Sequence, residues 1–273
     1  MLHLAIRLPY SWWQTGSGLM RPDKNGVPVY IQALKKELAS LGADMTEHTV
    51  DTVHFEGGYM GLLLPDDFTD LMATIHSSFH LAADAEVSGT LFPGSLDMAL
   101  ISTYQNYHAG PLMFEIPSLL MRECERYQLP NVLQLLDHTC YILQSYRQPD
   151  WGLSLARGIP GRTPEVWAHI AKEALHYQPA HIAFFDIAPR GDDGFSACAE
   201  LLLARGYRAV TPDFYTRAAR APRFLLPGDS IGAGLGAESR TDGFYTRNTD
   251  DLKRYLNSCG DYRNLLVQVR EEA

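Results

Sequence analysis

Short apolar runs alternate with helix-like segments along most of the chain, and this alternation limits the fold more than any other feature. The segments between the runs have apolar residues three or four apart, which is typical of amphipathic helices. Six strands are expected, at residues 3–8, 52–55, 85–91, 111–116, 151–156 and 181–187. Six β-α units in succession imply an α/β fold with a parallel sheet and right-handed crossovers, closed fully or partly into a barrel.

The helical segments follow the strands in order. They are expected at residues 29–42, 66–79, 96–104, 118–146 and 163–177, and the fourth forms one or two helices broken near Pro130. Gly42 is expected to cap the first helix, because glycine readily adopts the left-handed conformation found there. Residues 1–190 then form the barrel core, and residues 191–273 form an extension packed on it as part of a single structural unit. A functional site is expected at the C-terminal ends of the strands.

The composition limits the classes of function. A chain of 273 residues with 46% hydrophobic residues can bury a large core. The net charge of −9 argues against a nucleic-acid or anionic-membrane partner, because both require clustered Lys and Arg. We expect no secretory leader, because the opening segment lacks a charged region followed by a long apolar core and a cleavage site, and no apolar run approaches the roughly 18 residues of a membrane span. We therefore expect a cytoplasmic protein.

Residues able to ligate a metal are scattered. The cysteines form no C-x2-C pair and are expected to be reduced and mostly buried. They are Cys124, Cys140, Cys198 and Cys259. His76 and His80 are four residues apart, a spacing that can ligate a metal from one helix face. Because that helix is expected outside the barrel, we favour a solvated pair.

Other polar residues have structural explanations. His48 and His54 flank the second strand and are expected to be ordinary strand histidines. Asp192 and Asp193 follow the sixth strand, where a turn and helix N-capping account for them. We therefore assign none of these four residues to a site.

Several loops carry a resemblance to a known family. GIPGRT at residues 158–163 is similar to the GLPGQT turn of radical S-adenosylmethionine (SAM) enzymes of the oxygen-independent coproporphyrinogen III oxidase type. EGGYMGLL at residues 56–63 stands where that family has GGGTPSLL. DAEVSG at 84–89, SIGAGLGAES at 230–239 and YTRNTDDLKRYL at 245–256 resemble other family segments in the same order. The resemblance covers nearly the whole chain and implies a six-unit partial TIM-type (β/α) barrel with a short C-terminal extension.

The chain departs from this family where the cofactors bind. In the family, three cysteines in the loop after the first strand ligate an iron–sulfur cluster, and the corresponding residues here are Ser11, Thr15 and Gly18. Cluster iron requires thiolates, and a serine hydroxyl is not ionised near neutral pH. We therefore expect no iron–sulfur cluster, no metal at these degenerate positions and a pseudoenzyme with respect to radical chemistry.

Further substitutions point the same way. Tyr59 and Met60 replace the Thr-Pro of the glycine motif that contacts the SAM amino group in the family. Other family polar residues are replaced by Thr90, by Ser154 and by IPS at 116–118. We expect Trp12 and Trp13, with Tyr59 and Met60, to fill the vacated space and to stabilise the loop by burial. The family's C-terminal domain is expected to be absent.

Two carboxylates fall at the C-terminal ends of expected strands. Glu56 and Asp186 are candidates for catalysis or for orienting a cationic ligand, with a purely structural role as an equal alternative. Arg157 and Arg162 bracket the GIPG turn, where they either bind a carboxylate or phosphate or form salt bridges. The ligand-binding set expected from the sequence is Tyr10, Trp12, Glu56, Gly57, Gly58, Tyr59, Arg157, Gly158, Gly161, Asp186, Gly232 and Gly234.

The sequence leaves three functions open. The first is a cluster-free, noncatalytic relative of the coproporphyrinogen oxidase type that binds a small molecule, such as a tetrapyrrole or haem. The second is an enzyme that retains SAM or another ligand and performs polar, non-radical chemistry in the barrel mouth. The third is a noncatalytic subunit that pairs with an active homologue, or a homo-oligomer. The retained glycine loops favour the first two, although one arginine beside two carboxylates suits a zwitterion such as SAM better than a polyanionic porphyrin.

Overall fold

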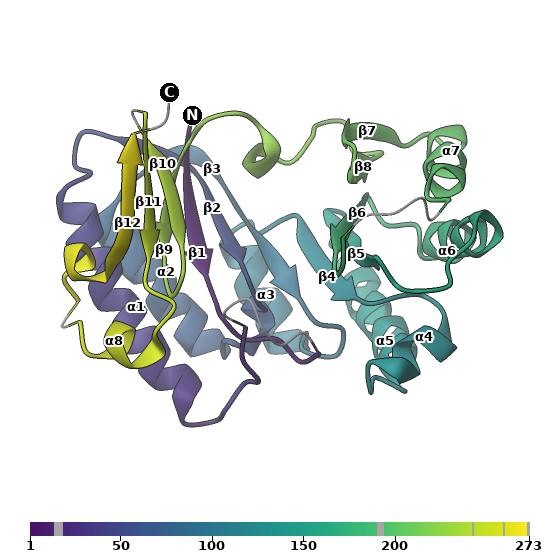
Figure 1. The fold of residues 1–273 in the computed structure, drawn as a ribbon, viewed down its shortest axis with the longest axis horizontal. Helices are drawn as coiled ribbons and strands as arrows, with labels where there is room; N and C mark the ends of the chain where they lie inside the picture. Colours follow the sequence, from purple (N-terminus) through teal and green to yellow (C-terminus); the bar gives the residue numbers. More distant parts are fainter. Residues whose placement is uncertain (14–18, 190–193, 242, 259, 272–273) are drawn as a thin grey trace. The chain divides into compact units, whose positions relative to one another are not determined.

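The computed structural model describes residues 1–13, 19–189, 194–241, 243–258 and 260–271 (Figure 1). It is an α/β fold in which the strands that alternate with helices pair in parallel, as the alternating pattern predicts. The chain divides into two compact units. Unit 1 comprises Met1–Thr90, Ser102–Ala109 and Leu226–Ala273, and unit 2 comprises Leu91–Ile101 and Gly110–Leu225.

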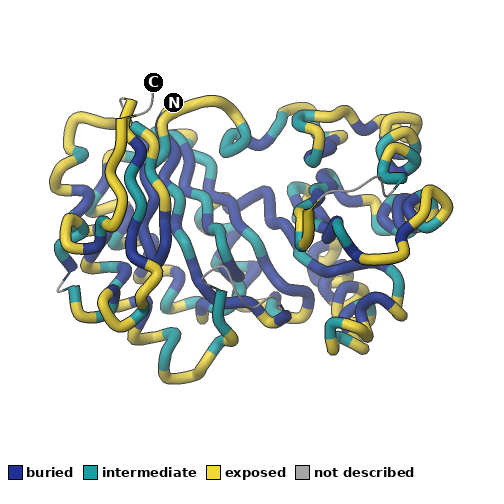
Figure 2. The backbone as a smooth tube through the Cα atoms, viewed as in Figure 1, coloured by how far each residue is buried: buried dark blue, intermediate teal, exposed yellow. Residues whose placement is uncertain are grey.

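A mixed sheet forms the centre of unit 1, in the strand order β12-β11-β10-β9-β1-β2-β3. The parallel strands are β1 (Leu2–Arg7), β2 (Thr49–Glu56), β3 (His80–Leu91) and β9 (Asp229–Ala233). The antiparallel strands are β10 (Glu238–Thr241), β11 (Phe244–Asn248) and β12 (Leu266–Glu271). β12 is mostly exposed, whereas β1 lies among buried strands (Figure 2). Residues 226–273, expected as part of an extension, thus continue the sheet beside β1.

Helices cover one face of this sheet. They are α1 (Gly26–Ala43), α2 (Pro65–Ser78), the short α8 (Leu252–Leu256), and the 3-10 turns η1 (Met60–Leu62) and η3 (Tyr262–Leu265), while α3 (Met98–Asn106) has residues in both units. Strand side chains alternate between faces, so one face of β1 and β2 is apolar and fully buried. Phe55 of β2, for example, packs on Phe68 of α2 with the ring centroids 5.6 Å apart.

Gly42 does not end α1, contrary to our expectation, because the helix continues to Ala43. A Cβ at Gly42 would lie 2.2 Å from the Ser78 carbonyl oxygen at the end of α2. The glycine is therefore required for the close approach of two helices rather than for a left-handed cap.

Unit 2 has its own strands in the order β4-β5-β6-β8-β7. β4 (Leu112–Ile116), β5 (Trp151–Arg157) and β6 (His181–Asp186) are parallel, and β8 (Phe214–Thr216) and β7 (Arg208–Thr211) are antiparallel. The helices are α4 (Met121–Arg126), α5 (Val132–Ser145), α6 (Pro164–Tyr177) and α7 (Ser196–Ala204), with a 3-10 turn, η2, at Arg223–Leu225. Trp167 of α6 is fully buried and packs edge-on against the rings of Phe184 and Phe195.

All six expected strands are present, and their ends agree with the prediction to within a few residues, except that β2 and β3 begin earlier. The segment 118–146 contains two helices, α4 and α5, interrupted around Pro130 as expected. The segment at 245–256 that resembles the family contains the end of β11 and the short helix α8. Within the described residues, none of the helices is long and apolar enough to cross a membrane.

The idea that His76 and His80 share a helix face is wrong. His76 lies in the last turn of α2, but His80 is the first residue of β3. Phe79 between them is extended, with φ −126° and ψ 145°, so the helix has already ended. The two histidines therefore do not form a helical i, i+4 pair.

Candidate functional site

The loop after β1 lies closely against the loop after β2. The backbone N–H of Tyr59 donates to the carbonyl of Tyr10 at 3.2 Å. A Cβ at Gly58 would lie 2.2 Å from the Leu8 carbonyl oxygen and 2.3 Å from that of Tyr10. Only glycine permits this approach, so Gly58 has a packing role in the resting protein.

The residues expected to fill the family's cluster site are mostly buried. Ser11 is 1% exposed, and its hydroxyl lies 3.5 Å from the Tyr59 hydroxyl. Trp13, Tyr59 and Met60 are buried as expected, but Trp12 is 39% exposed, so the expectation that both indoles are buried is wrong for Trp12. Trp12 lies in a bend, between the buried residues Ser11 and Trp13. Thr15 and Gly18 lie outside the described residues.

The available donors do not fit a cysteine-ligated cluster. Cys124, Cys140 and Cys198 are buried in unit 2, and burial raises the pKa of each thiol to about 12. They are therefore protonated thiols at neutral pH, whereas cluster iron binds thiolates. Among the described residues, no group of three or more His, Cys, Asp or Glu side chains is arranged to hold a metal ion. Cys259 lies outside the described residues.

Charged groups gather where β1 and β2 end. Burial raises the pKa of Glu56, an effect that Arg7 at the end of β1 opposes and Glu238 reinforces. Gly57 has φ +76°, and a Cβ there would lie 2.8 Å from Cγ of Arg7. The glycine therefore leaves room for the arginine side chain beside Glu56. A carboxyl whose pKa is raised by burial, with a cation beside it, is typical of functional sites.

A continuous row of side chains crosses the helix-free face of the unit 1 sheet. Residues directly opposite each other on neighbouring strands point to the same face, so the strand registers identify the members of this row. From β3 to β12 they are Glu86, Thr52, His3, Ser230, Arg240, Tyr245 and Arg270. Every member carries a polar group. We call this set the polar row.

Two histidines lie near the β1–β2 part of the polar row. His3 Nδ1 is 2.8 Å from the Thr52 hydroxyl, and its Nε2 is 3.0 Å from the carbonyl oxygen of Leu226. His54, on the same face of β2, has Nδ1 2.9 Å from the Ser88 hydroxyl. Burial, reinforced by His3, lowers the pKa of His54 to about 4. His54 is consequently a neutral imidazole at pH 7.

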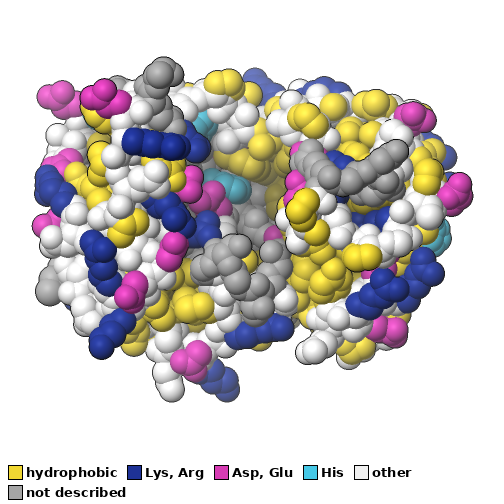
Figure 3. All heavy atoms as spheres, viewed as in Figure 1, with side chains coloured by type: hydrophobic (Ala, Val, Ile, Leu, Met, Phe, Trp, Pro, Cys, Tyr) yellow, Lys and Arg dark blue, Asp and Glu magenta, His cyan; other side chains and the backbone are white. Residues whose placement is uncertain are grey.

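The other end of the polar row is rich in arginine. The guanidinium groups of Arg240 and Arg270 lie 5.3 Å and 4.4 Å from the centroid of the Tyr245 ring. Arg247, two residues from Tyr245 on the same strand face, pairs with Asp250 at 2.6 Å. Basic and histidine side chains are visible on the face of unit 1 shown in Figure 3. This surface can accept carboxylates through guanidinium groups.

The loop at Gly232–Gly236 is tied to a buried carboxylate. The backbone N–H of Gly234 donates to Glu37 Oε2 at 2.9 Å, and Glu37 also accepts from Asn248 Nδ2 at 2.7 Å and the Tyr255 hydroxyl at 2.6 Å. A Cβ at Gly234 would lie 2.5 Å from the Arg7 carbonyl oxygen, and one at Gly232 would lie 2.3 Å from that of Glu238. Packing inside unit 1 therefore accounts for both glycines.

The candidates of unit 2 surround the ends of β5 and β6. Arg157 pairs with Asp213 at 3.0 Å, and its guanidinium lies 3.9 Å from the centroid of the Phe195 ring. Asp186 is exposed and lies opposite Arg157 in the strand register. Gly158 follows directly, with φ +82°. The expected set is thus divided, with Arg157, Gly158, Gly161 and Asp186 in unit 2 and Tyr10, Trp12, Glu56, Gly57, Gly58, Tyr59, Gly232 and Gly234 in unit 1.

Sequence reasoning missed the polar row and Arg7. A signal was present, because polar residues at alternate positions of a parallel strand, such as His3 and Arg7, indicate that one sheet face lacks an apolar cover. Predicting that Arg240 and Tyr245 lie on paired strands requires a second signal, the Asp242-Gly243 dipeptide, which is typical of a hairpin turn between two strands.

Comparison with known proteins shows what this geometry resembles. The chain is 25% identical over 194 residues to the haem chaperone HemW of Synechocystis sp., covering 68% of this chain and 45% of that protein. It is 22% identical over 280 aligned residues to the oxygen-independent coproporphyrinogen III oxidase of Salmonella typhimurium, covering 87% of this chain and 60% of the oxidase. The chain thus spans about half the length of these curated relatives. No protein-family model matches it.

A solved structure supports the same relationship. Coproporphyrinogen III oxidase (HemN) from Escherichia coli, described as a radical SAM enzyme, matches with a TM-score of 0.86 at 17% identity, covering 100% of this chain and 72% of the oxidase. The chain is homologous to HemN and HemW. The family resemblance of the sequence is therefore confirmed, and the HemN match shows the fold.

Proposed function

We propose that the protein is a cluster-free relative of the oxygen-independent coproporphyrinogen III oxidases that binds a tetrapyrrole, either haem or a porphyrin, without radical chemistry. The observation that carries this proposal is the polar row, which ends in Arg240, Tyr245 and Arg270. The relatives supply the ligand class, because one group consists of haem chaperones and the other of coproporphyrinogen oxidases. A cytoplasmic location and a partial six-unit barrel are further parts of this proposal.

The residues of the polar face fit a tetrapyrrole. Its carboxylates require several cations, and Arg240, Arg247 and Arg270 supply guanidinium groups of the kind that hold carboxylates bidentately. Arg247 already pairs with Asp250 at 2.6 Å and Arg240 lies 3.7 Å from Glu238, so a ligand carboxylate would compete with these partners. The sequence alone places one arginine, Arg157, beside two carboxylates, and this balance of charge favours a zwitterionic ligand. The additional arginines of β10–β12 favour a ligand with several carboxylates instead. If haem binds, a neutral imidazole nitrogen would hold its iron. His54, with its pKa lowered to about 4, is such an imidazole.

A second candidate is a SAM-type ligand used in polar chemistry, and the observation that favours it is Glu56. Its raised pKa at the end of β2 suits a general base or an anchor for a cationic group. Buried Tyr59 stands where the family's glycine motif contacts the SAM amino group, which weakens this alternative. The third function, a subunit of a complex with an active homologue, applies if the protein binds neither ligand.

Titration with haem tests the first candidate against the second. We expect a saturable shift of the Soret band in the wild type, weakened about tenfold or more in an Arg240→Ser/Arg270→Ser variant, because each charged hydrogen bond contributes roughly 1.5–3 kcal/mol. Arg205→Ser/Arg220→Ser is the matched control, since both arginines are exposed in unit 2. It should bind haem as the wild type does.

The opposite pattern would favour the enzyme. Calorimetric binding of SAM tighter than about 100 μM, lost in Glu56→Ala, would replace the tetrapyrrole proposal, since that affinity corresponds to about 5.5 kcal/mol. The cluster-free part is tested separately by anaerobic reconstitution with iron and sulfide. We expect a colourless protein, and a stable visible absorption band with about four irons per chain would contradict the proposal.

A further inference from the structure

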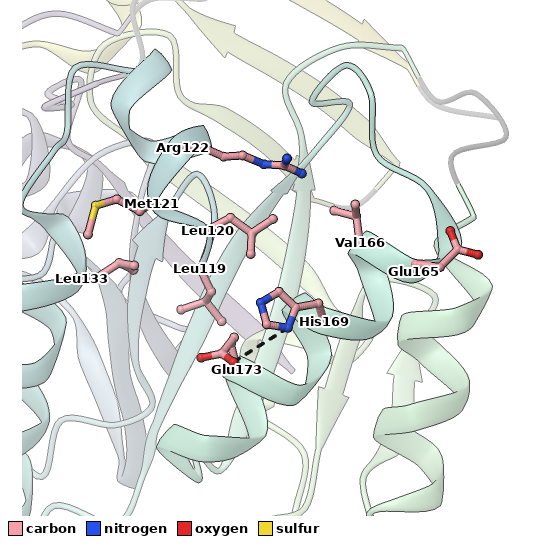
Figure 4. Close-up of a pocket in the computed structure, with 9 residues that line it drawn as sticks. All are labelled: Leu119, Leu120, Met121, Arg122, Leu133, Glu165, Val166, His169 and Glu173. Carbon is pink, nitrogen blue, oxygen red and sulfur yellow. Dashed lines mark ion pairs between the residues drawn. The ribbon is translucent and has the colours of Figure 1, made fainter.

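A groove of about 680 Å³ lies between α4 and α6 in unit 2, and none of its lining residues belongs to the polar row. Its apolar lining consists of Leu119, Leu120, Met121, Leu133 and Val166, and its charged lining consists of Arg122, Glu165, His169 and Glu173 (Figure 4). We call this feature the α4–α6 groove. Neither the proposed function nor the relatives assign it a role.

Buried contacts join α4, which forms one wall of the groove, to the turn that begins α6, which forms the other wall. Arg162, in the turn that begins α6, forms an ion pair with Glu123 of α4 at 2.9 Å, and neither side chain is more than 4% exposed. Arg162 also donates to the carbonyl oxygens of Ala156 at 2.5 Å and Pro117 at 3.2 Å. The GIPGRT motif therefore holds α4 beside α6. Because its walls are fixed in this way, the groove can receive a partner without first rearranging.

Opposite charges stand on the two sides of an apolar floor. Figure 4 shows Arg122 on one side of Leu119 and Leu120, and the His169–Glu173 pair on the other. His169 Nδ1 lies 3.9 Å from Glu173 Oε1. A ligand with only anionic groups would meet repulsion from Glu173, and one with only cationic groups would meet repulsion from Arg122. The groove is complementary to an apolar surface with a basic and an acidic edge.

The acidic side is also elongated. Glu165, His169 and Glu173 recur every four residues along α6, a stretch of about 12 Å at 1.5 Å per residue. That length corresponds to about two turns of a second helix. A small molecule would use only part of this stripe.

We propose that the α4–α6 groove docks an amphipathic helix of a partner protein, with apolar residues on the floor, basic residues facing Glu173 and acidic residues facing Arg122. This mode places the i, i+3, i+4 and i+7 side chains of the partner in the groove. It is independent of ligand binding on unit 1, so either proposal can fail without the other.

Three designed peptides of about 14 residues test the proposal. All three carry the same leucine stripe and differ in the residues along its two edges. The first peptide has Lys on one edge and Glu on the other, the second has Lys on both edges, and the third has Glu on both edges. Fluorescence anisotropy with the full chain should show that the Lys/Glu peptide binds at least about fivefold more tightly than the other two, since a mismatched edge loses charge pairing across the interface. A helix that binds in the reverse direction still presents one edge of each sign, so this comparison does not depend on orientation.

Charge reversal in the groove provides the matched variants. Arg122→Glu makes both sides acidic and should shift the preference to the Lys/Lys peptide, whereas Glu173→Lys should shift it to the Glu/Glu peptide. Leu120→Asp should weaken all three peptides about tenfold or more while leaving the far-ultraviolet circular dichroism unchanged, because it places a charge on the apolar floor.

Three outcomes would overturn the proposal. They are no saturable binding of any peptide to the wild type, equal affinities that charge reversal does not change, and self-association of the wild type that is abolished in Leu120→Asp. The last result would assign the groove to a second copy of this chain.

Discussion

The glycine turns at Gly158–Gly161 and Gly232–Gly236 are each held by a buried ionisable side chain, but the two side chains have different partners. In unit 2, Arg162 meets Glu123, so a cation and an anion neutralise each other beside the Gly158–Gly161 turn. In unit 1, Glu37 lies behind the loop that contains Gly234 and is held by hydrogen bonds from Gly234 N–H, Asn248 and Tyr255. Both arrangements fix a turn, yet the three groups that donate to Glu37 are all neutral.

This difference predicts two kinds of sensitivity. An ion pair fails when one partner is removed, because the other charge is left buried and uncompensated. A buried carboxyl held by neutral donors instead responds to pH, and burial accordingly raises the pKa of Glu37 from 4.5 to about 7. The stability of unit 2 should therefore be more sensitive to substitution, and the stability of unit 1 should be more sensitive to pH.

The largest effect is expected for Arg162→Met. The substitution keeps an apolar stem of similar length but leaves Glu123 buried without its cation, which should lower the free energy of unfolding by about 3–5 kcal/mol. Urea denaturation followed by circular dichroism measures this change. The α4–α6 groove should also be disturbed, because Arg162 joins its walls.

A second substitution distinguishes charge from packing. Adding Glu123→Leu to Arg162→Met removes the orphaned carboxylate, and the double variant should recover much of the lost stability. If the double variant is no more stable than Arg162→Met alone, the contacts of Arg162 with backbone carbonyls and with the Trp167 ring, rather than the ion pair, hold the turn.

The next effect concerns Glu37 and the pH. Its pKa in the folded protein lies above its value in the unfolded chain, so the folded state keeps a proton that the unfolded state releases between pH 4.5 and about 7. Stability from this group is therefore complete below pH 4.5 and falls as the pH rises towards 7, by up to about 3 kcal/mol.

Because other groups titrate in the same interval, the prediction concerns the difference between two proteins. Between pH 5 and 8, wild type should lose about 2–3 kcal/mol more stability than Glu37→Gln, as measured by denaturation at each pH. Parallel pH profiles for the two proteins would show that Glu37 is already ionised in the folded state at pH 5, and the contrast between the two units would then be lost.

The order of elements was predictable from sequence to a greater extent than the site. The strands and helices of the six β-α units follow local periodicity, which is written in consecutive residues. The polar row depends instead on which strand pairs with which, and nothing local places Arg240 opposite Ser230 or Arg270 opposite Tyr245. Arg162 illustrates the same limit, since the salt bridge left open by the sequence forms with a residue 39 positions away.

His54 provides a smaller pH effect of opposite sign within unit 1. Its pKa in the folded protein, about 4, lies below the ordinary 6.5, so the unfolded chain takes up a proton that the folded state excludes. Stability from this group is complete above pH 6.5 and is lost as the pH falls through 4. Between pH 7 and 5, wild type should lose up to about 2 kcal/mol relative to His54→Gln. Equal losses in the two proteins would mean that His54 is solvated and protonates freely.

The smallest effect separates the two turns by their glycines. Gly161 has φ +86°, but among the described residues no atom outside its chain neighbours lies within 4 Å of the position of a Cβ, so Gly161→Ala should cost only the backbone strain of about 1 kcal/mol. Gly234→Ala should cost several times more, because its Cβ would also lie 2.5 Å from the Arg7 carbonyl oxygen and 2.7 Å from the Tyr30 hydroxyl. Thermal unfolding of both variants measures the ratio. Titrations of folded Gly161→Ala with haem and with SAM then test the ligand-binding role expected from the sequence. If Gly161 contacts a ligand, the added methyl group should weaken binding. Unchanged binding would remove Gly161 from the site.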